Sequence, residues 1–321
     1  MFYPLELLSE WLTYSVLQIT PKTLLANTLT FFIADVLKIF ILLFVIIFIV
    51  SFIRTFFPAK RVRLFLAKRN RFVSHILAAM LGIITPFCSC SAVPLFLGFV
   101  EVGVPLGVTF SFLIASPMIN EVALVLLFGL FGWKISLFYI LSGLIIAIIS
   151  GIIIGRMKVE HLVADFALKN NDQEEANANI KISRKARVLY SYNYTIKIVK
   201  KVWPYILIGV GLGAWIHGYV PADFLAAYAG ADKWYAVPLA TLIGIPLYSN
   251  AAGIIPLISV LTEKGVAMGT TLAFMMAVTA LSLPEFMILK KIMKIKLIII
   301  FASVVGLGII VTGYLFNFIL K

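Results

Sequence analysis

Long apolar stretches are the feature that most limits what this chain can fold into. Eight of them approach or exceed the roughly 20 residues that a helix needs to cross a bilayer, and they occupy residues 30–53, 73–100, 104–131, 135–155, 202–220, 235–262, 266–289 and 297–320. Hydrophobic residues make up 62% of the 321 residues and charged residues only 13%. A soluble fold of this length could not bury so much apolar surface, so we expect an all-α polytopic membrane protein with membrane lipid as its solvent.

Positive charge is concentrated in three segments between the apolar stretches. The formal net charge is +13, and 21 of the 27 lysines and arginines fall within residues 54–71, 156–201 and 290–296. Loops that are retained in the cytoplasm carry such an excess of basic residues. No basic surface interleaved with aromatic residues accompanies them, so the charge predicts membrane topology and no nucleic-acid partner.

Several prolines, glycines and glutamates recur in the same order in the two halves of the chain. Pro94 corresponds to Pro256 and Glu101 corresponds to Glu263, each 162 positions later, a spacing that we call the repeat offset. Chance similarity between apolar helices would match leucines but would not match these residues. We therefore predict two homologous transmembrane repeats and a basic cytoplasmic linker between them. The boundaries are 28–155 for the first repeat, 156–200 for the linker and 201–321 for the second repeat.

The basic segments also predict how the two repeats are oriented. If all three segments lie inside the cell, three simple crossings between the first two would end on the wrong side of the membrane. The conflict disappears if each of the pairs 73–131 and 235–289 makes one net crossing, with one member of each pair re-entrant. The repeats then have inverted topology with broken or re-entrant helices, as in many secondary transporters, and both termini lie outside.

Residues 1–27 precede the first predicted span. Leu5, Leu8 and Trp11 recur at helical spacing, and polar residues such as Glu10 lie between them. This pattern is typical of an amphipathic helix at the membrane interface. An N-terminal extension of the first span explains the pattern equally well.

Two segments bounded by proline interrupt the apolar stretches. Pro86 and Pro94 enclose small polar residues, and the corresponding segment 246–256 is again polar and bounded by prolines. Each proline removes a helical hydrogen bond, and non-helical backbone inside a membrane is tolerated where protein or a water-filled cavity supplies partners. We predict that residues 84–94 and 246–256 are non-helical, face each other near the bilayer midplane and line a substrate site. The candidate substrate-binding residues are Cys88, Ser89, Cys90, Ser91, Ser116, Asn120, Ser249 and Asn250.

Two glutamates lie deep in apolar sequence, each after a further predicted helix break. They are Glu121, which follows Ser116-Pro117, and Glu285, which follows Pro284 and lies 164 positions later. An ionised carboxylate at that depth is costly unless it is paired. One hypothesis makes both residues coupling groups that bind and release protons, with protons as the candidate coupling ion. The alternative hypothesis makes each carboxylate a cap on a nearby helix N-terminus.

The two cysteines of the chain, Cys88 and Cys90, lie between the first pair of prolines. Side chains at i and i+2 point apart in a regular helix or strand, but they can converge in an irregular turn. Thiolates are soft ligands that prefer thiophilic centres, so the pair is a candidate site for a thiophilic substrate. The alternative is that both are inert small hydrophobic residues. Nothing in the pattern calls for a cofactor or a resident metal ion.

Several sequence blocks are specific enough to indicate a family. Residues 86–91 read Pro-Phe-Cys-Ser-Cys-Ser, residues 103–107 read Gly-Val-Pro-Leu-Gly, and residues 116–121 read Ser-Pro-Met-Ile-Asn-Glu. Together they resemble the predicted-permease family that includes ArsP, over about 28–320. The resemblance implies an inner-membrane permease of bacteria or archaea, and ArsP itself exports trivalent organoarsenicals such as methylarsenite.

The resemblance also gives the cysteine pair a chemical rationale. Methylarsenite has two exchangeable hydroxyls, so two thiols could replace both of them. A single thiol could equally bind the arsenic while Ser89, Ser91 or Asn120 holds the remaining oxygen.

We therefore expect a multi-pass permease of the secondary type in the cell (inner) membrane, and not an enzyme. It would export a small solute, with a trivalent organoarsenical or another thiophilic compound as the candidate substrate. The chain has no Walker A motif, so it hydrolyses no ATP itself. One alternative is a membrane thiol oxidoreductase, although redox dithiols usually have Cys-x-x-Cys spacing. Another is a non-catalytic subunit of a larger membrane complex.

Overall fold

The computed structural model of the chain is a bundle of helices. It describes residues 3–16, 18–20, 23–54, 71–84, 89–101, 103–119, 121–163, 184–219, 233–247, 254, 257–259, 261–262 and 265–320. Within these ranges there is no β-strand, and the isolated antiparallel bridge between Val163 and Met293 is the nearest approach to one. The prediction of an all-α membrane protein is confirmed at this level.

The helices differ widely in length, from long rods to short segments that end at breaks. They are α1 (Tyr3–Trp11), the π-helical η1 (Leu12–Val16), α2 (Leu24–Arg54), α4 (Arg71–Ile84), α5 (Ser89–Glu101), α6 (Leu106–Met118), α7 (Glu121–Arg156), the 3₁₀-helical η2 (Glu160–Leu162), α9 (Arg184–Tyr219), α11 (Ala236–Gly244), α13 (Met268–Ala280), α14 (Leu283–Leu289) and α15 (Ile295–Ile319). Helix α7 is interrupted at Gly132, whose φ of 81° and ψ of 173° are not helical. It therefore consists of two helices, residues 121–131 and 133–156.

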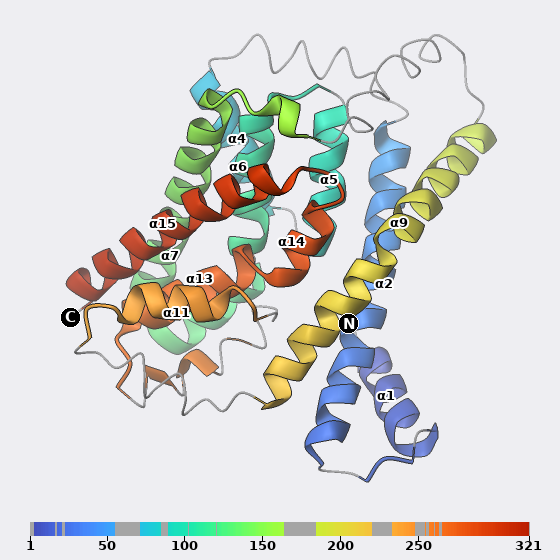
Figure 1. Ribbon diagram of the computed structural model, residues 1–321, viewed down its shortest axis with the longest axis horizontal. Coiled ribbons are helices and arrows are strands. Elements are labelled where there is room, and N and C mark those ends of the chain that lie inside the picture. Colours follow the sequence, from blue (N-terminus) through green and yellow to red (C-terminus); the bar gives the residue numbers. More distant parts are fainter. Residues whose placement is uncertain are drawn as a thin grey trace.

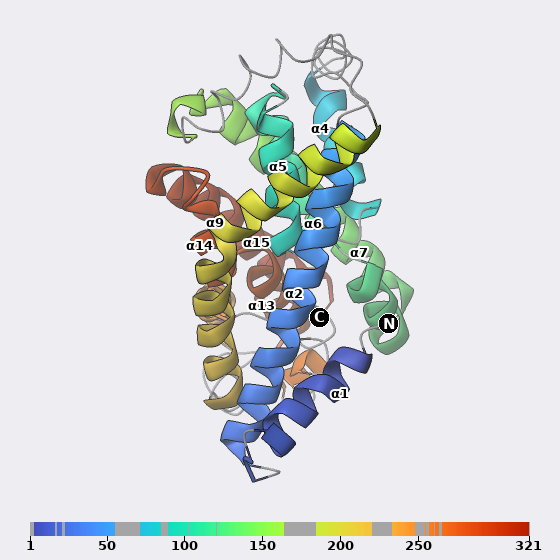
Figure 2. The same cartoon turned by 90° about the vertical axis from the view of Figure 1, so that its right-hand side faces the viewer.

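The long helices α2 and α9 lie side by side along one edge of the molecule (Figures 1 and 2). Phe44 of α2 meets Tyr192 of α9 edge to face, with ring centroids 6.2 Å apart. Helix α1 packs against α2 (Figure 1), but the two do not form one continuous helix, because residues 18–20 are non-helical. That α1 lies at the membrane interface stays a prediction.

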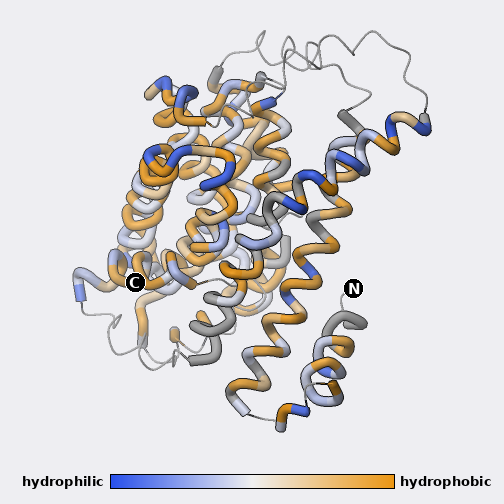
Figure 3. Tube along the Cα trace, turned by 45° about the vertical axis from the view of Figure 1, so that its right-hand side comes forward, coloured by the Kyte–Doolittle hydropathy of each residue, from blue (hydrophilic) through white to orange (hydrophobic). Residues whose placement is uncertain are grey.

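Three helical stretches of the described chain are long and apolar enough to cross a membrane: Ala123–Arg156, Met268–Leu289 and Ile295–Ile319. Hydrophobic residues run along nearly the whole length of these helices (Figure 3). On α7 the exposed apolar side chains recur every four residues, at Leu137, Leu141, Ile145, Ile149 and Ile153. One face of the helix is therefore suited to lipid.

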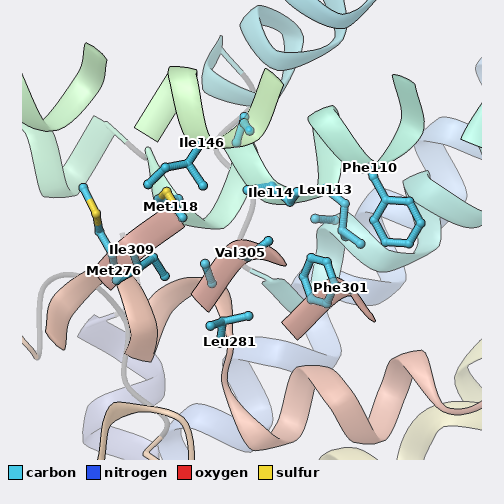
Figure 4. Close-up of a cluster of buried hydrophobic side chains, with 14 of the residues drawn as sticks. Phe110, Leu113, Ile114, Met118, Ile146, Met276, Leu281, Phe301, Val305 and Ile309 are labelled. Atoms are coloured by element: carbon cyan, nitrogen blue, oxygen red, sulfur yellow. The ribbon is translucent and has the colours of Figure 1, made fainter. Parts of the chain in front are cut away.

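Helices α4 to α7 of the first half meet helices α11 to α15 of the second half, and we call this contact the seam. Figure 4 shows Phe110, Leu113 and Met118 of α6 close to apolar side chains of the second half. The rings of Phe110 and Phe301 have centroids 5.6 Å apart. In lipid such a seam is held by close van der Waals packing, since lipid tails are as apolar as the side chains themselves.

One tight turn occurs twice. After α5, Gly103 has a φ of +81°, and its N–H donates to the Val100 carbonyl at 3.0 Å. One repeat offset further along the chain, Gly265 has a φ of +83°, and its N–H donates to the Thr262 carbonyl at 3.0 Å. A left-handed backbone of this kind favours glycine, because a Cβ would be strained there.

One close helix contact also occurs twice, with the same spacing. A Cβ on Gly107 of α6 would lie 2.5 Å from the carbonyl oxygen of Gly151 on α7. A Cβ on Gly269 of α13 would overlap the carbonyl oxygen of Gly313 on α15 in the same way. Glycine is therefore required on both helices where their backbones touch, as is common between transmembrane helices.

Candidate functional site

Helices α4, α5 and α6 are all too short to cross a bilayer. They have 14, 13 and 13 residues, or about 20 Å each at about 1.5 Å per residue, whereas the hydrocarbon core is about 30 Å thick. Near the starts of α4 and α6, the Nδ1 atom of His75 lies 2.8 Å from the hydroxyl oxygen of Ser111. Near their ends, Gly82 lies against the backbone of Ser116. The two helices therefore run in the same direction.

Helix α5 runs in the opposite direction, because the turn at Gly103 joins its end to the start of α6. Phe96 of α5 packs edge to face on Phe110 of α6, with centroids 5.1 Å apart. The start of α5 and the end of α6 therefore both lie away from the turn at Gly103, and both α4 and α5 pack on α6.

The break that was predicted at 116–121 lies between α6 and α7. Helix α6 ends at Met118, and Ile119 departs from helical geometry with φ −120° and ψ 79°. Its N–H still caps the Ala115 carbonyl at 2.9 Å. The Met118 carbonyl accepts a 2.7 Å hydrogen bond from the hydroxyl of Tyr139, a fully buried residue of α7.

The second predicted break, before Glu285, lies between α13 and α14. Leu281 and Ser282 are non-helical, and the Leu281 N–H caps the Ala277 carbonyl at 2.9 Å. At the start of α14 the Leu283 N–H donates to the Ile245 carbonyl at 2.9 Å. This bond brings the end of α11, where the polar segment 246–256 begins, directly to the break.

Buried polar side chains gather at these two breaks. The hydroxyls of Ser116 and Ser282 are buried and have no hydrogen-bond partner among the described residues. Glu285, in the first turn of α14, is completely buried. Helix α14 packs on both α5 and α9, so Glu285 lies on a helix that touches the one beginning at Ser89.

The predicted substrate-binding residues divide into three groups. Ser116 is described in full. Ser89, Cys90 and Ser91 form the first turn of α5, although only their backbone is described. The others lie outside the described residues: Cys88, Asn120, Ser249 and Asn250.

The first segment predicted to be non-helical, 84–94, is partly helical. Ile84 belongs to α4 and residues 89–94 belong to α5, so the prediction is wrong for these residues. Residues 85–88 lie outside the described part of the chain. Pro94 lies early in α5, where the helix gives up one hydrogen bond and continues. In the second half residues 246–247 are non-helical, whereas Ile254 is helical.

The two glutamates hold slightly different places in their helices. Glu121 is the first residue of α7, whereas Glu285 is the third residue of α14. The starts of these two helices are separated by the repeat offset, as are the repeated glycines. The glutamates are thus displaced by two positions along otherwise corresponding helices.

Sequence reasoning placed a helix break at Ser282 but did not count Ser282 among the candidate site residues, and it missed Tyr139. Ser282 and Glu285 have the Ser-x-x-Glu spacing of a helix start. Tyr139 gave no local signal, since its partner is the backbone of a different helix. Among the described residues no group of three or more His, Cys, Asp or Glu side chains could hold a metal ion.

The fold and the paired breaks define a polytopic α-helical membrane protein. The family follows from the comparison with known families: the model ArsP_1, described as a predicted permease, matches residues 24–318. The chain therefore belongs to this predicted-permease family and is a membrane permease.

Relatives from archaea and bacteria cover most of the chain. UPF0718 protein MJ0584 of Methanocaldococcus jannaschii is 21% identical over 314 residues, covering 81% of this chain and 86% of that protein. A Streptococcus mutans protein, whose name predicts a subunit of a two-component membrane permease complex, is 26% identical over 256 residues, covering 78% and 81%. UPF0718 protein YraQ of Escherichia coli is 24% identical over 249 residues, covering 76% and 68%. No solved structure matches the chain significantly.

Proposed function

We propose that the chain is a secondary-type permease that exports a small solute through a site at the paired helix breaks. The observation that carries this proposal is the pair of buried hydroxyls, Ser116 and Ser282, which have no partner among the described residues. Unpaired polar groups are costly in a membrane interior, and a polar substrate or water would supply their missing hydrogen bonds. Both serines border breaks in short helices, as in transporters that bind substrate at discontinuous helices.

We infer further that the two halves, residues 28–155 and 201–321, are inverted repeats. The turns at Gly103 and Gly265 support this arrangement, since they share one conformation and are separated by the repeat offset. The short lengths of α4 and α5 support a re-entrant hairpin made by these two helices. Under this proposal both termini lie outside the inner membrane and the basic linker 156–200 lies in the cytoplasm.

For the substrate we propose a trivalent organoarsenical or another thiophilic compound held at Cys88 and Cys90. The support comes from thiol chemistry, because soft thiolates bind As(III) strongly. Ser89, Ser91, Ser116, Asn120, Ser249 and Asn250 would provide polar contacts. Glu121 and Glu285 would carry protons in exchange for substrate, which the complete burial of Glu285 supports.

A sensitivity panel tests the proposed function directly. Cells with and without the gene are challenged with trivalent and pentavalent organoarsenicals, inorganic arsenite, antimonite and oxyanions. The proposal predicts that the gene protects selectively against trivalent organoarsenicals and lowers their accumulation in the cell. Equal sensitivity across the whole panel would contradict a role in exporting thiophilic solutes.

A second candidate function is favoured by the Streptococcus mutans relative. Its name predicts one subunit of a two-component permease complex, so this chain could require a second membrane protein to transport. Reconstitution of the purified chain separates the two candidates. Transport by the chain alone supports the single-chain permease, whereas transport only with a co-purified partner supports the two-component form.

A further inference from the structure

Two residues of α7, Tyr139 and Gly143, contact the end of α6. The hydroxyl of the fully buried Tyr139 donates a 2.7 Å hydrogen bond to the Met118 carbonyl. One turn further, a Cβ on Gly143 would lie 2.7 Å from Cγ1 of Ile119. The absence of a side chain there lets Ile119 pack against the α7 backbone. Polar and steric contacts thus hold the same two residues at the break.

The hydrogen bond from Tyr139 gives the Met118 carbonyl a donor that the helix break removes. Met118 is the last residue of α6, and the last carbonyls of a helix have no partner within it. The N–H of the next residue, Ile119, donates to the Ala115 carbonyl and so does not serve Met118. Inside a membrane no bulk water replaces the missing donor, so the phenol supplies it from a different helix.

The end of α6 that Tyr139 binds also lies at the seam between the halves. Helix α6 contacts α13 of the second half, and Met118 lies close to Met276 and Ile309 (Figure 4). The hydrogen bond from Tyr139 therefore holds a helix end that faces the second half.

The corresponding position in the second half lacks this hydroxyl. One repeat offset after Tyr139 the chain has Phe301, which carries no hydroxyl. Phe301 instead packs on Phe110 of α6 and Phe286 of α14, with centroids 5.6 Å and 6.3 Å away. The end of α6 is thus held by a phenol, whereas the ring at the corresponding position makes apolar contacts.

We propose that Tyr139 is a positioning residue for transport. Its hydroxyl keeps the end of α6, and with it Ser116, fixed against α7 while the site changes between its two accessible states. Tyr139 itself does not touch the substrate. The inference rests on the proposed permease function, but its structural part is testable without any substrate.

The test compares Tyr139→Phe, which removes only the hydroxyl, with the wild-type chain. The two native cysteines report on the site, because Cys90 lies in the first turn of α5, which packs on α6. Purified protein in lipid vesicles is treated with a maleimide, and alkylation of each cysteine is followed by mass spectrometry. We expect Cys90 to react about tenfold faster in Tyr139→Phe, because water enters to satisfy the orphaned Met118 carbonyl. Methylarsenite efflux should fall by about the same factor at unchanged protein level.

Two further variants keep the inference falsifiable. Ser142→Ala removes another buried hydroxyl of α7, which bonds only within its own helix, to the Tyr139 carbonyl at 3.0 Å. It should leave alkylation unchanged, and an equal rise in both variants would overturn the proposal. Gly143→Ala places a Cβ 2.7 Å from Cγ1 of Ile119. It disturbs the same helix end and should raise alkylation about threefold, even if Tyr139→Phe fails to fold. Wild-type rates in both Tyr139→Phe and Gly143→Ala would also overturn it. If the wild-type chain moves no methylarsenite but the alkylation differences persist, the substrate proposal fails while the positioning role stands.

Discussion

Gly103 and Gly265 adopt the same left-handed conformation, with φ values of +81° and +83°, at corresponding positions of the two halves. In both turns the next residue, Val104 or Val266, donates its N–H to a carbonyl five residues earlier, at 3.0 Å. The helices that follow, α6 and α13, are separated by the repeat offset at both their first and their last residues. This agreement supports the proposal that the chain contains two copies of one structural unit.

The inverted-repeat proposal predicts that these two turns lie on opposite sides of the membrane. Pro105 and Ala267 follow the two glycines at equivalent positions, so each can be replaced by cysteine in a chain whose native cysteines are serine. An impermeant maleimide should label Pro105→Cys only from the cytoplasmic side and Ala267→Cys only from the outside. Labelling of both from the same side would rule out inverted topology.

The glycine contact between α6 and α7 should be sensitive to a single methyl group. Gly107→Ala places a Cβ 2.5 Å from the Gly151 carbonyl, and such overpacking costs about 1–3 kcal/mol. We expect a lower unfolding temperature in detergent for Gly107→Ala, and the same for Gly269→Ala. The control is Gly129→Ala, where no atom lies within 4 Å of the new Cβ and helix propensity predicts a small gain of about 0.5–1 kcal/mol. Equal stability of Gly107→Ala and Gly129→Ala would refute the close contact.

The sequence predicted the helix breaks well but not what satisfies them. Prolines, glycines and polar residues in apolar stretches are local signals, and they located the breaks after Met118 and Ala280. The helical conformation of residues 89–94 was not predicted because proline is read as a helix breaker, although α5 gives up one hydrogen bond at Pro94 and continues. The bond from Tyr139 to Met118 depends on how α7 folds back on α6, and no local pattern encodes it.

The buried serines at the breaks should affect binding more than stability. Ser116 and Ser282 have unpaired hydroxyls within the described chain, and removing an unpaired buried group is neutral or slightly stabilising. Ser116→Ala and Ser282→Ala should therefore keep their unfolding temperature, while the apparent KM for substrate rises about fivefold through the loss of roughly 1 kcal/mol of hydrogen bonding.

A matched control for these variants is Ser191→Ala in α9. The Ser191 hydroxyl is also buried, but it donates to the Arg187 carbonyl at 2.9 Å. Its loss should lower stability slightly and leave KM unchanged. Unchanged KM in both Ser116→Ala and Ser282→Ala would remove these serines from the proposed site.

Glutamine variants of Glu121 and Glu285 distinguish the coupling hypothesis from the capping hypothesis. Glu121→Gln and Glu285→Gln imitate the protonated side chain, so under the coupling hypothesis each should bind substrate but lose transport driven by an imposed pH gradient. A capping role predicts near-normal flux, since the Gln carbonyl still accepts a hydrogen bond and only modest stability is lost. Gradient-driven flux in proteoliposomes decides between them, and normal flux in both variants would exclude the carboxylates from coupling.

Uptake of methylarsenite into everted membrane vesicles tests the central claim most directly, because export from cells becomes uptake in this preparation. We predict energised uptake by the wild-type chain, and its loss in Cys88→Ser and in Cys90→Ser at equal protein level. Gly129→Ala serves as the control and should transport normally. Uptake by the double Cys88→Ser, Cys90→Ser variant at the wild-type rate would contradict a thiol-based site, and no uptake by the wild-type chain would contradict the proposal that this chain alone exports methylarsenite.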